Sequence, residues 1–205
     1  MSADLGTTVL TWISVIIGTM LALMFTCMAG AGKTCACHPF NKAMTFGFDY
    51  VFGPFLGCPG ALLRLLIGLG ELAAGSGLLI GLWGDVLGLL SEELSDLSKC
   101  LTIVAGTGLM TICIMAASMH KYLDGAPGLP GVLAVVWLMF LFVRIFIVGP
   151  QTWKNQMLCT GLCAGIVVIA AATAIVNKLR GKHEKTVEDY NKQLRILMGG
   201  QEAQV

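Results

Sequence analysis

The chain has 205 residues, of which 56% are hydrophobic and only 12% are charged, and its mean hydropathy is +0.81. Because an average globular domain carries about a quarter charged residues, this composition excludes an ordinary water-soluble domain and predicts an integral membrane protein. Thirteen basic residues nearly balance twelve acidic ones, and no basic run accompanies an aromatic-rich surface, so nucleic-acid binding is excluded as well.

Five apolar segments are long enough to cross a bilayer, since a helical span needs roughly 20 mainly apolar residues. In chain order they are 8–30, 61–83, 101–119, 132–148 and 157–177. Pro and Gly residues bound the fourth segment on both sides, and proline marks helix boundaries because it lacks the amide donor. We therefore expect an all-α integral membrane protein whose transmembrane bundle occupies residues 1–178.

Two segments lie outside the predicted spans. Residues 31–59 are rich in aromatic side chains, which favours a segment in the membrane interface or an ordered loop packed over the end of the bundle. The basic tail, 179–205, has apolar residues spaced along one helical face at Val187, Tyr190, Leu194 and Leu197. It is predicted to form a short amphipathic helix that docks on a partner, lies on an anionic membrane surface or folds onto its own bundle.

An odd number of spans places the two termini on opposite sides of the membrane. One side collects Lys33, Lys42, Lys121 and the basic residues of the tail, whereas the other collects the N-terminus and an acidic loop after the second span. The positive-inside rule therefore predicts an outer N-terminus and an inner C-terminus.

Glu71 stands within the second predicted span, where an ionised side chain costs roughly 2.5–3.5 kcal/mol on insertion and normally faces protein. Gly68 and Gly75 share its helical face and allow a neighbouring helix to approach closely. Counted from the inner ends of their helices, Glu71 and Arg144 reach similar depths. We therefore predict a buried Glu71–Arg144 pair that fixes helix register, or, alternatively, a protonatable Glu71 in a redox or transport path.

Other motifs give weaker indications. Gly161 and Gly165 have the spacing of close helix packing, within the chain or against a partner subunit. The string CACH, residues 35–38, lacks a second pair at zinc spacing, so no metal site is predicted. His120, at the end of the third span, is expected to form an interfacial hydrogen bond. There is no C-x-x-C-H motif and no four-cysteine run for haem or an iron–sulfur cluster.

The succession of a helix ending in MAGAGK, the stretch LGCPGALLRLLIGLGELAAGSGLLIGL and a helix ending near MAASMH resembles the DoxX-like family of small membrane proteins. The likeness covers roughly residues 22–148. It implies a four-helix bundle with Lys33, Glu71 and His120 at recurrent polar positions, to which this chain adds a fifth span and the basic tail. Some members of that family are subunits of quinone-linked sulfur oxidoreductases, and others belong to redox-stress complexes or act as assembly factors.

Together these features favour a non-catalytic accessory or scaffold subunit of a larger membrane protein complex, in an energy-transducing membrane. No residue is assigned a catalytic role. The alternative is a DoxX-like membrane subunit of a quinone-linked oxidoreductase with Glu71 in proton exchange. A quinone, lipid or pigment bound between helices would contact Lys33, Arg64 and His120, and the expected partners are other membrane subunits and the lipid bilayer.

Overall fold

The computed structural model describes residues 5–88, 90–124, 128–150 and 152–179, with the single residues Glu188 and Lys192. Its elements are helical throughout this part of the chain. In order they are α1 (Leu5–Leu23), η1 (Met24–Gly30), α2 (Ala31–Thr34), α3 (Asn41–Gly47), η2 (Phe48–Phe52), α4 (Gly53–Leu56), α5 (Gly60–Val86), α6 (Glu92–Asp124), α7 (Gly128–Phe146) and α8 (Trp153–Leu179).

Five helices in the described residues are long and apolar enough to cross a membrane, which identifies an all-helical integral membrane protein. They are Leu5–Thr34, Gly60–Val86, Leu94–Ser118, Gly128–Phe146 and Trp153–Ala172. Each predicted span coincides with one of them. Most of the predicted tail, 179–205, lies outside the described residues.

The first helix is longer than its apolar sequence predicts. α1 continues without a break through η1, a stretch with wider π-helical turns, into α2, so the helix ends at Thr34 and not at Gly30. This extension carries Lys33 onto the bundle, whereas the sequence placed that lysine in a loop beginning at residue 31.

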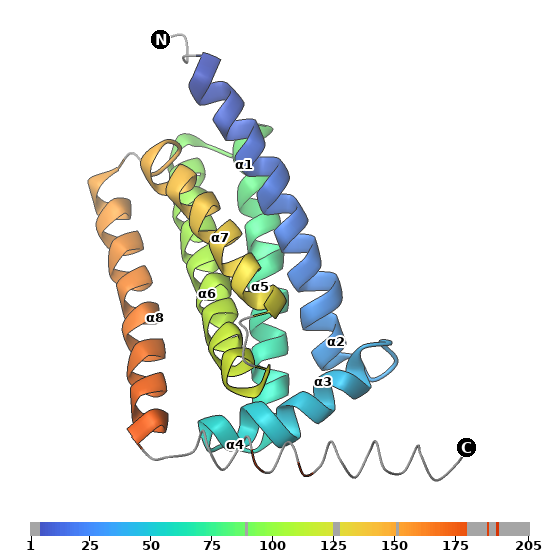
Figure 1. The fold of residues 1–205 in the computed structure, drawn as a ribbon. Coiled ribbons are helices and arrows are strands. Elements are labelled where there is room, and N and C mark those ends of the chain that lie inside the picture. Colours follow the sequence, from blue (N-terminus) through green and yellow to red (C-terminus); the bar gives the residue numbers. More distant parts are fainter. Residues whose placement is uncertain are drawn as a thin grey trace.

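The remainder of the predicted loop, up to residue 59, is also largely helical. α3, η2 and α4 lie across one end of the bundle (Figure 1). Phe48 and Val51 are buried there, and Gly57 ends α4 in the left-handed conformation, with φ of 71°. The segment thus packs over the end of the bundle, as one of the two alternatives predicted.

A compact core joins α1, α5, α6 and α7. Trp137 of α7 is fully buried, and its ring lies 5.9 Å from that of Phe25 and 5.4 Å from that of Phe140. Buried aliphatic side chains of α5 and α6 complete it: Leu78, Leu82, Ile103 and Leu109. α8 stands at the edge of the bundle, packing on α6 and touching α4 (Figure 1).

The glycines of α5 allow the first helix to approach, as predicted from their spacing. A methyl group at Gly68 would come within 2.8 Å of Lys33 Cβ, and one at Gly75 would collide with the Thr26 hydroxyl. By contrast, a methyl group at Gly161 or Gly165 would meet no atom of the described chain within 4 Å. No described residue of another helix packs on these two glycines, and contact with a partner subunit stays a prediction.

Candidate functional site

The most deeply buried ion pair in the described part of the chain joins Lys33 to Glu71. Lys33 Nζ donates a hydrogen bond of 2.6 Å to Glu71 Oε2, and the two side chains are only 8% and 2% exposed. The ammonium group also lies 3.4 Å from the carbonyl oxygen of Ala29 and 5.9 Å from the centre of the Phe48 ring. Three helical segments, the end of the first helix, α5 and η2, therefore enclose this charge.

The backbone around Lys33 is held from two further sides. Arg64 Nη1 donates to the carbonyl oxygen of Lys33, and Asn41 Nδ2 donates to that of Gly32 at 3.0 Å. Since both carbonyls belong to the last turn of a helix, which leaves its final carbonyls without intrahelical donors, these side chains satisfy groups that would otherwise be unpaired. They also fix the position of Lys33 against α5.

Arg144 does not pair with Glu71, so the predicted Glu71–Arg144 contact is wrong. Arg144 lies two residues before the end of α7 and contacts Asp85, one residue before the end of α5, with 4.0 Å between Nη2 and Oδ2. Counting residues from the predicted inner ends placed Glu71 and Arg144 at one depth, but such a count does not show how far α7 is shifted along α5. In the packed bundle Arg144 lies beside Asp85, near the C-terminal end of α5.

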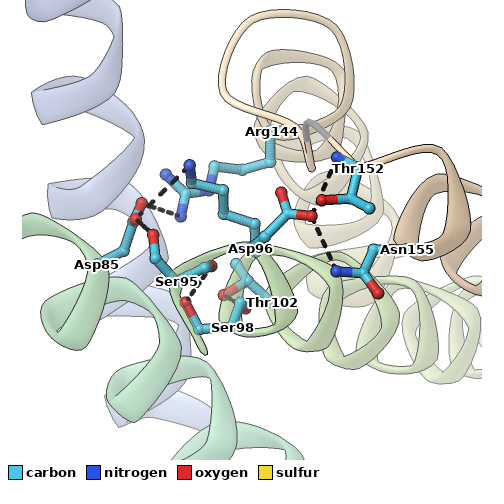
Figure 2. Close-up of polar contacts among 9 residues, drawn as sticks. Asp85, Ser95, Asp96, Ser98, Thr102, Arg144, Thr152 and Asn155 are labelled. Atoms are coloured by element: carbon cyan, nitrogen blue, oxygen red, sulfur yellow. Dashed lines mark hydrogen bonds and ion pairs between the residues drawn. The ribbon is translucent and has the colours of Figure 1, made fainter. Parts of the chain in front are cut away.

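A polar cluster surrounds Asp85 at that end of the bundle (Figure 2). Ser95 Oγ donates to Asp85 Oδ1 at 2.6 Å, and Lys99 Nζ lies 3.8 Å from the same oxygen. Arg144 is 1% exposed, and both of its terminal nitrogens lack a hydrogen-bond partner among the described residues. Arg144 is therefore a buried cation that faces the Asp85 carboxylate at 4.0 Å without a hydrogen bond to it.

Asp96 connects α6 to the start of α8 (Figure 2). Its Oδ2 accepts hydrogen bonds from the Thr152 amide at 3.1 Å and from Asn155 Nδ2 at 2.8 Å. The sequence placed Asp85 and Asp96 in an acidic loop because the second span was predicted to end at residue 83 and the third to begin at residue 101. Ser91, followed by two glutamates, is a helix-start signal that indicates the earlier beginning of α6.

The remaining predicted contact residues divide between two places. Arg64 and Lys33 come together, and Arg64 Nε is a buried donor without a hydrogen-bond partner in the described part of the chain. His120 lies half-buried near the end of α6, where a methyl group at Gly128 would come within 3.9 Å of its ring. No described group of three or more His, Cys, Asp or Glu residues has the arrangement to hold a metal ion.

The chemistry of the site follows from these contacts. Lys33 and Glu71 balance each other's charge in apolar surroundings and link the first helix to α5, while Arg64 Nε is free to donate a further hydrogen bond. No protein-family model matches the chain, and neither does any curated protein or solved structure.

Proposed function

We propose that the protein is a non-catalytic accessory or scaffold subunit of a larger membrane protein complex, and that α8 is the helix that meets the partner. The placement of α8 carries the proposal. Only 6% of the residues in its most apolar window are buried within the chain, against 22–44% in the other four spans. α8 therefore contributes little to the core of its own bundle.

The surface of α8 suits close contact with another transmembrane helix. In a bilayer, apolar area alone does not drive helices together, because lipid tails are equally apolar, and small residues that allow backbones to approach favour association. Gly161 and Gly165 supply such a stripe, and both are exposed with open space around them. A partner helix at this face would gain packing that the chain itself does not supply.

The test is gentle detergent extraction of the native protein, followed by size separation and mass spectrometry of the proteins that migrate with it. We expect other membrane subunits to migrate with the wild type and to be lost in Gly165→Leu. Gly70→Leu is the matched control, because Gly70 is also an open glycine of a span, on α5. Migration near 21.7 kDa plus detergent, without partners, would contradict the proposal.

The proposal includes a DoxX-like bundle with an outer N-terminus and an inner C-terminus. The contact between Lys33 and Glu71 supports the first part, since the resemblance gives both as recurrent polar positions. Lys42, Lys121 and the basic tail support the orientation, although Lys33 lies inside the bundle and no longer contributes to the count. Labelling Cys35 and Cys37 with a membrane-impermeant maleimide in sealed, oriented vesicles tests it, and reaction from the outer side would contradict it.

One observation favours a second candidate, a quinone-linked oxidoreductase subunit. Arg64 Nε could donate a hydrogen bond to a quinone carbonyl or to a lipid phosphate oxygen. Glu71, on the same helix, is in contact with Lys33. In this reading Arg64 would orient the head group and Glu71 would exchange protons. One quinone extracted per purified protein, and a smaller amount from Arg64→Met, would support this candidate. A purified protein that contains no quinone would contradict it.

A further inference from the structure

Two exposed thiols lie against each other in the turn after the first helix. Cys35 Sγ and Cys37 Sγ are 2.9 Å apart, and both side chains are exposed. Neither cysteine belongs to a membrane span or takes part in the Lys33–Glu71 contact. A scaffold role of α8 does not involve these two thiols.

The turn that carries these thiols is held in place by its own hydrogen bonds. The Cys35 amide donates to the carbonyl of Ala31 at 2.8 Å, and the His38 amide donates to the carbonyl of Cys35 at 3.1 Å. Asn41 fixes the preceding Gly32 from the other side of the turn. Because the backbone is already ordered, bringing the two sulfurs together costs little additional entropy.

The separation of the sulfurs distinguishes a redox pair from a metal site. Two thiolates bound at about 2.3 Å to one tetrahedral zinc ion would be roughly 3.8 Å apart. The observed 2.9 Å is shorter than that. No third His, Cys, Asp or Glu ligand joins the pair in the described part of the chain, so formation of a sulfur–sulfur bond fits the geometry better.

We propose that Cys35 and Cys37 form a reversible dithiol–disulfide pair that is oxidised by thiol exchange with a low-molecular-weight disulfide. The Cys35 thiolate attacks one sulfur of that disulfide, forming a mixed disulfide and releasing the other half as a thiolate. The Cys37 thiolate then attacks the Cys35 sulfur, closing the Cys35–Cys37 bond and releasing the second half. Two electrons pass from the cysteines to the small disulfide, and the two protons go to the released thiols.

The environment of the pair assigns the order of attack. A hydrogen bond with the Cys37 thiol stabilises the Cys35 thiolate and lowers the pKa of Cys35, while the same contact raises the pKa of Cys37. The thiolate is the nucleophile in exchange reactions. An exposed thiol of lowered pKa beside a resolving cysteine is a common arrangement of a redox-responsive pair. Cys35 is therefore the attacking thiol and Cys37 the resolving one.

The experiment treats the full-length protein in detergent with oxidised glutathione, stops exchange with acid, alkylates the remaining thiols and identifies peptides by mass spectrometry. We expect the peptide with both cysteines to lose two hydrogen atoms. Cys37→Ser should stop the reaction at a mixed disulfide of glutathione with Cys35, because the resolving thiol is absent. Cys58→Ser is the control, because Cys58 lies in a separate turn, and it should leave ring closure unchanged.

Three results would overturn the proposal. One is that both cysteines stay reduced at a concentration of oxidised glutathione that fully oxidises dithiothreitol. Another is two glutathione adducts on the wild type without ring closure. The third is one zinc ion retained per protein as purified and lost in Cys37→Ser, which would assign the pair to metal binding instead.

Discussion

Lys33 and Glu71 are 38 residues apart in the sequence, yet 2.6 Å separates their charged atoms within the bundle. Their contact fixes the last turn of the first helix against α5, at a position where Gly68 leaves space for it. An unpaired charge at this place would be costly, because the two side chains are only 8% and 2% exposed. Helix register and charge balance are therefore coupled at this point.

We predict that Glu71→Gln destabilises the protein, because it leaves the Lys33 ammonium buried without an opposite charge. Loss of one partner from a buried pair typically costs about 3–5 kcal/mol. Reversible unfolding in mixed detergent micelles measures the change in free energy of unfolding. The double variant Lys33→Met with Glu71→Gln is expected to recover part of the loss, and additive effects of the two changes would contradict direct pairing.

At the other end of α5, Asp85→Asn is expected to destabilise the protein more than Lys99→Met. Both basic residues contact Asp85, but Arg144 is buried whereas the Lys99 side chain is 20% exposed and can reach solvent. Removing the carboxylate takes away the Asp85 charge that lies 4.0 Å from Arg144, whereas removing the lysine leaves the Arg144–Asp85 contact. Unfolding under the same conditions ranks the two variants, and equal effects would show that Arg144 has another source of charge balance.

Alanine substitutions on α5 should separate packing glycines from open ones. Gly75→Ala and Gly68→Ala are expected to destabilise, since the new methyl group would collide with the first helix. Gly70→Ala is the matched control on the same helix, with no atom within 4 Å of the added carbon. It should be neutral or stabilising by up to about 1 kcal/mol, because alanine favours helix more than glycine does. Loss of stability in Gly70→Ala would contradict the open placement.

The two thiols of the turn should differ in their pH dependence. Since the pKa of Cys35 is lowered and that of Cys37 is raised, Cys35 keeps a larger thiolate fraction as the pH falls. The Cys37→Ser substitution removes the thiol whose hydrogen bond lowers the pKa of Cys35. The alkylation rates of the two thiols are therefore compared in the wild type. Peptide mass spectrometry after brief iodoacetamide pulses should show first modification mainly at Cys35 at every pH below full ionisation. Preferential modification of Cys37 would reverse the assigned roles.

The sequence by itself determined the class of protein and its five helices. Apolar length is a local property, so each predicted span coincides with a helix, and the largest error is at the start of the third, which begins at Glu92 and not at residue 101. It was also predictable that the Glu71 side chain faces other helices and not lipid. A charge within a span normally faces protein, and Gly68 and Gly75 mark the packed face of α5.

Only the tertiary structure decided which residue pairs with Glu71. Similar depths in the membrane led to the prediction that Glu71 pairs with Arg144. Which charges meet, however, depends on where each helix begins and on how far it is shifted along its neighbours. The first helix continues to Thr34 and brings Lys33 to Glu71, while Arg144 meets Asp85 at the opposite end. Polarity and period are local properties of the chain, but the pairing of charges depends on the packing of whole helices.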